Sequence, residues 1–349
     1  MPLRSFKLVE EFIRERNASA GVALVGYKGM QYGPSFFGTT GFFPGAPAVT
    51  ADTIFDLASL TKVVGTTTAA LGLLGEGVFH LQSELGDLLE DVPRDKAGIT
   101  VQQLLSHTSG LAATAPLYLR AKGPDDVIEQ ILHSPLEYET GSQVVYSCLG
   151  FILLGRIMER FTKRALDHLV TERVLTPLQM HDSFYNPPQD VQARIAFTEW
   201  CPRTKRFLRG TVHDENAQAM GGISGNAGLF STASDLGKLA DMILQGGTQA
   251  GHTVLDKRVV GWLDNCYTEG LNERRTLGWM LHSKPSSGGD LLSPSSLGHT
   301  GFTGTSIWID RERELYCVLL TNRVHPVRTN ESIFQLRPAF HDSVISELT

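Results

Sequence analysis

Cysteine is scarce in this sequence. The 349 residues include four cysteines, Cys148, Cys201, Cys266 and Cys317, and no two of them form a Cys-x-x-Cys pair. This spacing excludes a disulfide scaffold and gives no zinc-binding pattern. Runs of lysine or arginine are also missing, and the net charge is -6. The sequence therefore lacks the electrostatic footprint of a protein that binds nucleic acid or an anionic membrane.

Long apolar runs are missing as well. No stretch approaches the roughly 18 consecutive apolar residues of a membrane span. The charged N-terminal segment has no apolar core of the kind found in secretory signals, so we expect a cytoplasmic protein without a membrane partner. What is present is ordinary for a globular chain, with 42% apolar and 19% charged residues. At about 150 residues for each domain, the length allows two domains.

Apolar periodicity predicts two kinds of segment. Residues 3–13 have helical spacing, and the valine-rich run 21–27 predicts a strand. Near the other end, 305–309 and 315–320 flank a charged turn and predict a hairpin of two buried strands. A terminal helix is predicted from about Pro338 to Leu348.

The middle of the chain has a different character. From residue 63 to about 178 the apolar spacing is mostly three to four, which predicts consecutive helices. Residues 182–212 indicate a long connection, and Thr232 is predicted to cap a further helix. We therefore predict an α/β (α+β) domain formed by residues 1–75 and 205–349, with an inserted, mainly helical domain at residues 76–204.

Ser59 and Lys62 form the only Ser-x-x-Lys pattern in the chain. Residues i and i+3 share a helix face, so the lysine amine can lie next to the serine hydroxyl. The apolar segment from Ile54 to Leu57 precedes the pair and helical spacing begins at Val63, which puts Ser59 at a helix N-terminus. There the helix dipole favours negative charge on the serine oxygen. The structural alternative is an N-cap serine followed by a solvated lysine.

Two further motifs follow in order, Tyr146-Ser-Cys148 and His299-Thr-Gly301, and the second opens the C-terminal hairpin. Another segment reads Leu104-Leu-Ser-His-Thr-Ser-Gly-Leu111. Together with Ser59-Leu-Thr-Lys62, these motifs resemble the serine β-lactamase and penicillin-binding-protein superfamily, in particular its class C-like branch, which includes the family VIII esterases. The resemblance spans nearly the whole chain. It implies a β-lactamase/transpeptidase-like fold, in which an antiparallel sheet is flanked by helices and an all-helical domain is inserted.

The resemblance also implies a role for several residues. Ser59 is expected to be acylated, while Lys62 supplies a positive charge and Tyr146 acts as a phenolate-like base toward Ser59. A free tyrosine, with a pKa near ~10, needs the lysine beside it for this task. The backbone N–H groups of Ser59 and Phe302 are expected to form the oxyanion hole. A core tyrosine is the structural alternative for Tyr146.

Cys148, His299, Thr300 and Gly301 are expected on the substrate side of the cleft, and two of them depart from the family pattern. Transpeptidases and β-lactamases of this superfamily commonly have Asn at the position of Cys148 and Lys at the position of His299. A thiol cannot offer the paired donor and acceptor of an amide. A histidine is mostly neutral near pH 7 and anchors a substrate carboxylate less firmly than a lysine does.

We therefore expect a serine hydrolase that works through an acyl-enzyme and prefers carboxylic esters, whose leaving groups need less assistance than those of amides. Its partner is a small-molecule ester or amide, and no cofactor or metal is expected. A β-lactamase or D,D-peptidase stays open as an alternative. A D-aminopeptidase or muropeptide amidase also stays open, because the segment from His213 to Phe230 is similar to one common in this branch. A non-catalytic binding protein on the same fold is the third alternative.

Other residues invite a chemical interpretation. Cys148 paired with a histidine would be a thiol nucleophile, but a small buried cysteine beside the site is the preferred interpretation. His213, Asp214 and Glu215 are consecutive, and consecutive side chains seldom converge on one metal ion, so we expect a solvated or hydrogen-bonded turn there. His107 is assigned a structural role in a turn near the cleft.

Overall fold

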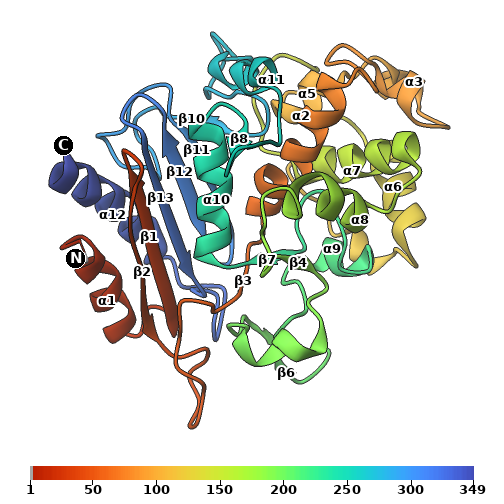
Figure 1. Cartoon of the computed structure of the whole chain (residues 1–349). Helices are drawn as coiled ribbons and strands as arrows, with labels where there is room; N and C mark the ends of the chain where they lie inside the picture. The colour runs from red at the N-terminus through yellow and green to blue at the C-terminus, as the bar shows by residue number, and fades with distance from the viewer. Residues whose placement is uncertain (1–2) are drawn as a thin grey trace.

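A six-stranded antiparallel sheet forms the centre of the computed structural model, which describes residues 3–349. Its strand order is β10-β11-β12-β13-β1-β2 (Figure 1). The strands are β1 (Ala20–Tyr27), β2 (Met30–Gly38), β10 (Met280–Leu281), β11 (Leu297–Thr300), β12 (Ser306–Asp310) and β13 (Leu315–Thr321). β1 pairs with β13, with Gly21 opposite Thr321, so segments from both ends of the chain are neighbours within the sheet. The predicted strand at 21–27 and the predicted C-terminal hairpin are confirmed.

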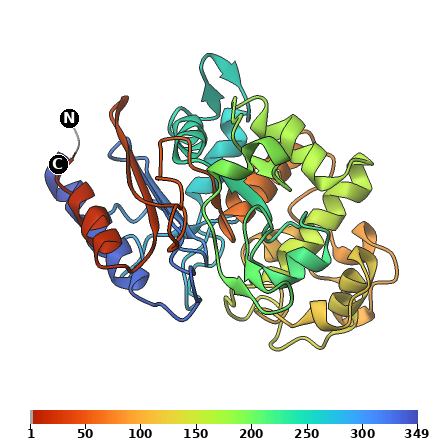
Figure 2. The ribbon, with the colours of Figure 1, turned by 90° about the horizontal axis from the view of Figure 1, so that it is seen from below.

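Three helices cover the two faces of this sheet. They are α1 (Phe6–Arg14), α10 (Ala233–Leu244) and α12 (Ile333–Leu348). α1 and α12 lie side by side on the outer face, as Figure 2 shows, and α10 lies on the inner face. α1 buries Phe6, Val9 and Phe12 at the predicted helical spacing. The predicted cap of α10 is also present, because the Thr232 side chain accepts a hydrogen bond from the Asp235 backbone N–H at 3.2 Å.

α12 begins earlier than the sequence predicts. The sequence predicts a start at about Pro338, whereas the helix begins at Ile333 and Pro338 lies inside it. Ile333 and Leu336 are buried in the apolar cluster between this helix and the sheet. This packing outweighs the loss of one backbone hydrogen bond at the proline.

Helices fill the chain from residue 62 to about 178, and no strand interrupts that described stretch, as the apolar spacing predicts. They are η1 (Lys62–Thr67), α2 (Thr68–Gly75), α3 (Leu85–Leu88), α4 (Arg94–Ala97), α5 (Val101–Leu105), η2 (Leu117–Leu119), α6 (Pro124–His133), α7 (Cys148–Thr162), α8 (Leu166–Val170) and η3 (Thr171–Leu175). Later in the chain come η4 (Gln189–Arg194), α9 (Glu215–Ala219), α11 (Lys257–Gly261) and η5 (Trp262–Asp264). Among the helices of residues 3–349, none has the length and apolar character needed to span a bilayer.

Short strands build three smaller sheets. Their strands are β3 (Phe55–Asp56), β4 (Phe184–Tyr185), β5 (Trp200–Cys201), β6 (Arg206–Phe207), β7 (Leu229–Ser231), β8 (Thr248–Gln249) and β9 (His252–Thr253). β7 lies between β3 and β4, while β5 pairs with β6 and β8 with β9. The predicted connection at 182–212 contains β4, η4, β5 and β6 joined by irregular backbone.

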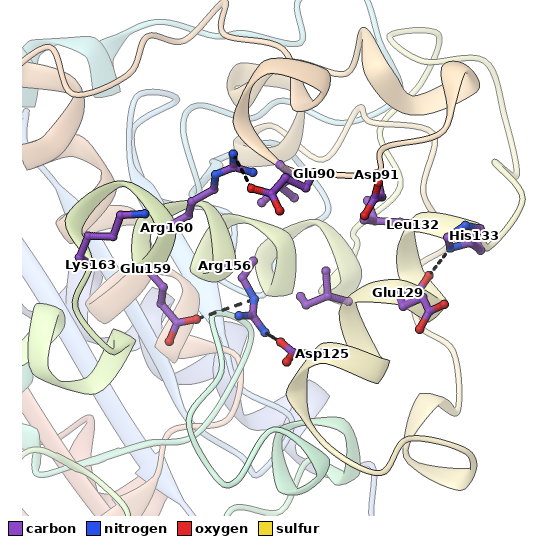
Figure 3. Close-up of a pocket in the computed structure, with 12 residues that line it drawn as sticks. Glu90, Asp91, Asp125, Glu129, Leu132, His133, Arg156, Glu159, Arg160 and Lys163 are labelled. Carbon is purple, nitrogen blue, oxygen red and sulfur yellow. Dashed lines mark hydrogen bonds and ion pairs between the residues drawn. The ribbon is translucent and has the colours of Figure 1, made fainter.

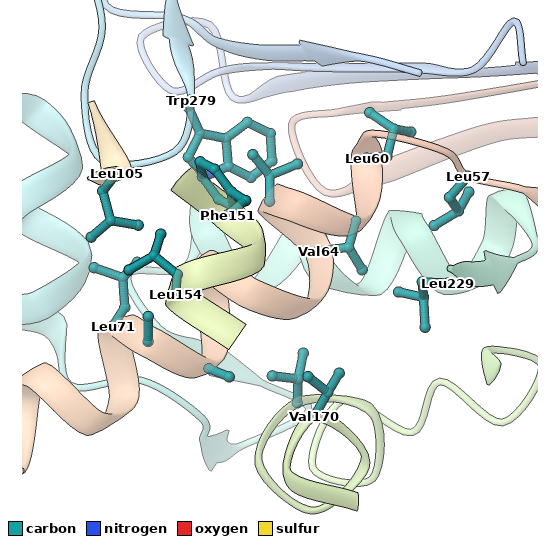
Figure 4. Close-up of a cluster of buried hydrophobic side chains, with 14 of the residues drawn as sticks. Leu57, Leu60, Val64, Leu71, Leu105, Phe151, Leu154, Val170, Leu229 and Trp279 are labelled. Atoms are coloured by element: carbon teal, nitrogen blue, oxygen red, sulfur yellow. The ribbon is translucent and has the colours of Figure 1, made fainter. Parts of the chain in front are cut away.

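One hydrophobic core joins the inner face of the sheet to the helices. Its buried members include Val22 and Leu24 of β1 together with Leu105, Phe151 and Leu154 of the helical part. Figure 4 shows the helical portion of this cluster, where Phe151 and Trp279 pack together. Because apolar contacts continue from one part to the other, the proposed boundaries between the two domains stay a prediction. A separate cluster lies between the sheet and the two outer helices.

Candidate active site

Ser59 lies in a tight turn after β3, directly before the first helical turn. Ala58, the residue before it, has a φ of 47°, a left-handed conformation that is strained for alanine. The Ala58 N–H donates to Asp56 Oδ1 at 2.8 Å, and the Leu57 N–H donates to the Leu229 carbonyl at 3.0 Å. These bonds hold the turn and leave the Ser59 side chain partly exposed.

Lys62 is fully buried, and its amine contacts the serine. Lys62 Nζ donates to Ser59 Oγ at 3.0 Å, to the Asn226 carbonyl at 3.0 Å and to Cys148 Sγ at 3.4 Å. Burial lowers the pKa of the Lys62 ammonium, whereas Cys148 and Tyr146 in their ionised forms raise it, and the net direction is upward. Lys62 is therefore a cation at neutral pH, which donates to Ser59 rather than accepting its proton.

Two cations lie against the ring of Tyr146. Its centroid is 4.9 Å from Lys62 Nζ and 5.4 Å from Arg275 Cζ. The hydroxyl is buried and has no hydrogen-bond partner within the described part of the chain. Burial raises the pKa of Tyr146, and the Lys62 charge acts in the opposite direction without reversing that shift. The phenol is therefore protonated at rest, and the phenolate is a minor form.

His299 lies beside Tyr146, with 5.7 Å between the two ring centroids. His299 Nδ1 is 2.9 Å from the Thr300 carbonyl oxygen, whereas the buried Nε2 has no hydrogen-bond partner among residues 3–349. Burial, together with the charges of Lys62 and Arg275, lowers the pKa of His299 well below its ordinary value. The His299-Thr-Gly301 motif therefore presents a neutral imidazole to the site.

The structure thus brings Ser59, Lys62, Tyr146, Cys148 and His299 into one cluster. Cys148 is the first residue of α7, and its free thiol is half-buried rather than fully buried. It contacts the lysine of the cluster, and no histidine is among its hydrogen-bond partners in the described residues.

The loop after β11 is tied to the turn that carries the serine. The Thr303 hydroxyl donates to the Asp56 carbonyl at 2.7 Å, and the Thr305 hydroxyl donates to the Leu57 carbonyl at 3.0 Å. The two segments that carry the predicted oxyanion donors are therefore joined through buried hydrogen bonds, which fix one against the other.

Two arginines hold the carbonyl groups of this loop. Arg337 Nη2 donates to the Gly301 and Thr305 carbonyls, each at 2.8 Å, and Arg323 Nε donates to the Phe302 carbonyl at 2.8 Å. A Cβ atom on Gly301 would lie 2.1 Å from Thr305 Oγ1, so only glycine fits there. The peptide group that contains the Phe302 N–H is therefore held in one orientation.

Sequence reasoning missed Arg275 and Arg337. Arg275 lies in the charged run Glu273-Arg-Arg275, and no spacing distinguishes it from a solvated residue. Arg337 did give a signal, because it lies among the buried positions of α12 together with Leu336 and Phe340. A basic residue at a buried helical position requires polar partners, which here are the carbonyl groups of the oxyanion loop.

His107 and His213 have structural partners. His107 Nδ1 accepts a hydrogen bond from the Ser147 N–H at 2.9 Å, and its ring centroid is 4.7 Å from that of Tyr146. His213 Nε2 lies 2.9 Å from Glu199 Oε2, in the hydrogen-bonded turn that the sequence predicts. Among residues 3–349, no three His, Cys, Asp or Glu side chains come together where they would hold a metal ion.

Comparison with known proteins decides the family. The beta-lactamase family model matches residues 7–338. The chain belongs to the beta-lactamase family. It is a serine hydrolase of that family, so the interpretation as a non-catalytic binding protein is set aside and the resemblance drawn from the motifs is confirmed.

Two curated relatives and one solved structure show what this beta-lactamase-family chain is similar to. A "Putative D-alanyl-D-alanine carboxypeptidase" of Escherichia coli (strain K12) is 33% identical, over 79% of this chain and 70% of its own length. The "N-acetylmuramyl-L-alanine amidase" of Bacillus subtilis (strain 168) is 32% identical, over 81% of this chain and 72% of its own. The beta-lactamase/D-alanine carboxypeptidase from Pseudomonas syringae has a TM-score of 0.80 at 17% identity, covering 99% and 98% of the two chains. This likeness confirms the expected β-lactamase/transpeptidase-like fold.

Proposed function

We propose that this serine hydrolase cleaves esters through an acyl-enzyme on Ser59. In the reactive form Tyr146 is a phenolate, which takes the proton from Ser59 Oγ as that oxygen bonds to the substrate carbonyl carbon. Tyr146 then gives the proton to the leaving oxygen as its bond to the acyl carbon breaks. A water molecule next gives a proton to Tyr146 and attacks the acyl carbon, and Ser59 leaves with that proton. The N–H groups of Ser59 and Phe302 bind the oxyanion in both steps.

Fixed positive charge supports this use of Tyr146. The phenolate is scarce at neutral pH because burial raises the pKa of Tyr146. When it forms, Lys62 and Arg275 already lie 4.9 and 5.4 Å from the ring centroid and stabilise the negative charge without reorganising. Lys62 also donates to Ser59 Oγ, which stabilises the serine oxygen as it loses its proton.

The observation that carries the preference for esters is the neutral His299. A D,D-peptidase must hold the free carboxylate of its substrate, and a cation at this position would do so. His299 is uncharged here because burial and two neighbouring cations lower its pKa. Cys148 adds to this preference, since a thiol cannot pair with a substrate amide as an asparagine side chain does. A neutral ester needs neither contact.

A second candidate is cleavage of the amide between an N-acetylmuramyl group and L-alanine. Its support is the Bacillus subtilis amidase, which is 32% identical over 81% of this chain. The bond cut in that case joins a sugar-linked acyl group to an amine. The neutral His299 imidazole is compatible with that substrate, because no free carboxylate has to bind beside it.

The proposal is tested by intact-mass measurement on separate samples. One sample is incubated with a fluorophosphonate and the other with p-nitrophenyl acetate. We expect one phosphonate adduct on Ser59, and loss of both labelling and ester turnover in Ser59→Ala. Ser142→Ala, at an exposed serine outside the site, is the matched control and should behave as the natural sequence does. Full ester turnover by Ser59→Ala would refute the nucleophile. Comparison with nitrocefin, a D-alanyl-D-alanine peptide and N-acetylmuramyl-L-alanine ranks the substrate classes.

A further inference from the structure

Several cavities lie outside the Ser59 cluster in the described residues. The first, of about 650 Å³, lies between α6 and the C-terminal half of α7 (Figure 3). Some of its charged side chains are paired with one another, as in the contacts of Arg156 with Asp125 at 2.5 Å and of Arg160 with Glu90 at 3.0 Å. Cys148 lies at the opposite end of α7, so this cavity is separated from the proposed nucleophile by most of that helix.

The second cavity, of about 560 Å³, adjoins the oxyanion loop. His213 lines it, and the His213 ring stacks on that of Phe302, with 5.6 Å between the centroids and 30° between the planes. The volume is in the range of pockets that bind small molecules. His213 therefore places the cavity next to the side chain that follows the His299-Thr-Gly301 motif.

Residues 113–118 connect this cavity with the part of α7 that belongs to the Ser59 cluster. The Cys148 N–H donates to the Ala113 carbonyl at 2.8 Å, which places residues 113–118 beside the start of α7. Asn216 then holds this segment from the other side: its Nδ2 donates to the Ala115 carbonyl at 2.8 Å, and its Oδ1 accepts from the Tyr118 N–H at 3.1 Å. Tyr118 in turn lines the cavity. Residues 113–118 thus run from the start of α7, where Cys148 lies, to the cavity.

The charges in this cavity cancel within it, because two glutamates, Glu199 and Glu215, are balanced by two arginines, Arg203 and Arg328. Glu199 Oε2 accepts from His213 Nε2 at 2.9 Å and from Arg328 Nε at 2.5 Å, and Arg328 Nη2 pairs with Glu215 Oε1 at 2.6 Å. A carboxylate or phosphate would meet the two glutamates, whereas a cation would meet the two arginines. A neutral ligand is repelled by neither the glutamates nor the arginines. Its hydroxyl groups can form hydrogen bonds with the remaining lone pairs and N–H groups of these side chains.

Two aromatic side chains complete the cavity. Trp200 is 44% exposed and Tyr118 is 40% exposed, and both line it. Each offers a flat apolar face next to a polar edge. A pyranose ring has the matching surface, because its C–H face is apolar and its rim carries hydroxyl groups. We propose that this cavity is a subsite for a neutral pyranose ring attached to the scissile ester or amide, an inference that rests on the proposed function of Ser59.

Binding is tested on the Ser59→Ala protein, in which no turnover occurs. Saturation-transfer NMR with N-acetylglucosamine should detect contact with the sugar C–H groups. Trp200→Ala and Tyr118→Ala should each weaken binding by about threefold to tenfold, the value of one aromatic face. Phe36→Ala is the matched control, because Phe36 is an exposed aromatic residue on β2 at the far edge of the sheet. No saturation transfer, or equal binding by all variants, would overturn the subsite.

Turnover by the protein that keeps Ser59 shows which sugar-linked substrate the subsite serves. We expect a larger kcat/KM for one of two sugar-linked substrates, an O-acetylated glucosamine ester or an N-acetylmuramyl-L-alanine amide, than for p-nitrophenyl acetate. The kcat/KM for that sugar-linked substrate, divided by the kcat/KM for p-nitrophenyl acetate, should fall at least about threefold in Trp200→Ala. A ratio that Trp200→Ala leaves unchanged contradicts the subsite. Failure of the proposed function looks different, because then no substrate turns over and no phosphonate labels Ser59, while sugar binding is still measurable.

Discussion

Arg337 Nη2 donates a hydrogen bond to the carbonyl oxygen of Gly301 at 2.8 Å, from a helix on the opposite face of the sheet from the helical part. That oxygen and the Phe302 N–H belong to the same planar peptide group. A charged donor on the oxygen polarises the group and makes its N–H a stronger donor to the substrate oxyanion. Arg337 is thus a positioning residue for the proposed oxyanion hole.

Arg337→Lys should therefore lower kcat by about tenfold, less than the loss of a complete oxyanion donor. KM should change by less than about twofold, because the contact matters most when the oxyanion forms. Affinity for a boronic acid that mimics the tetrahedral intermediate should fall by the same factor as kcat. Unchanged boronate affinity in a folded Arg337→Lys protein would show that Arg337 only stabilises the fold.

The protonation of Tyr146 predicts a pH dependence. Burial raises the pKa of Tyr146 above its ordinary value of 10.0, so the reactive phenolate becomes more abundant as pH increases. We expect kcat/KM for p-nitrophenyl acetate to rise about tenfold for each pH unit from 7 toward 9, after subtraction of the rate with Ser59→Ala. Tyr146→Phe should lose at least about 100-fold in kcat. A plateau that begins near pH 7 would argue for another base.

His299→Lys tests the role of charge in the His299-Thr-Gly301 motif. A lysine there supplies the cation that the motif resemblance leads one to expect, at a position already close to Lys62 and Arg275. We expect the kcat/KM for a D-alanyl-D-alanine peptide, divided by that for p-nitrophenyl acetate, to rise by about tenfold, the value of one charge-assisted hydrogen bond. The melting temperature should fall because three cations then lie together. His299→Gln is the neutral control and should leave the ratio as it is.

Glu199 predicts how stability depends on pH. Burial acts to raise its pKa, but hydrogen bonds from His213 and Arg328 lower it from 4.5 to about 2. Because the folded-state pKa is the lower one, Glu199 stabilises the fold above pH 4.5, and this contribution is lost as pH falls toward 2. After allowance for solvent screening we expect ~1–2 kcal/mol.

Urea unfolding of Glu199→Gln at pH 7 and at pH 3 measures this contribution. The variant should be less stable than the natural sequence at pH 7, and the difference should shrink at pH 3. Glu139→Gln is the matched control, because Glu139 is exposed and its side chain forms no ion pair within residues 3–349. An equal difference at both pH values would rule out the ionised carboxylate as the cause.

Local pattern explains what could be predicted from the sequence. The spacing of Phe6, Val9 and Phe12 is visible without any knowledge of the sheet on which they pack, and Lys62 lies near Ser59 because three residues make almost one helical turn. The start of α12 could not be read in this way, because the packing of Ile333 against the sheet decides it. The helix predicted from the sequence therefore begins later than the helix in the structure.

Long-range contacts explain what could not be predicted. Arg275 reaches Tyr146, and Arg337 reaches Gly301, only after the sheet has brought distant segments together. The protonation of Tyr146 depends likewise on burial, which the sequence does not state. The motifs indicated which side chains meet, whereas the cations that surround them and the cavity beside Phe302 required the structure.

The pairing of β1 with β13 has a consequence for synthesis. Thr321, the partner of Gly21, is made about 300 residues later in synthesis. At about 5–20 residues per second, β1 waits on the order of tens of seconds with one edge unpaired. Such an edge can pair with other chains. The nascent chain is therefore exposed to aggregation while the helical part is being made, because this edge of β1 stays unpaired until β13 follows.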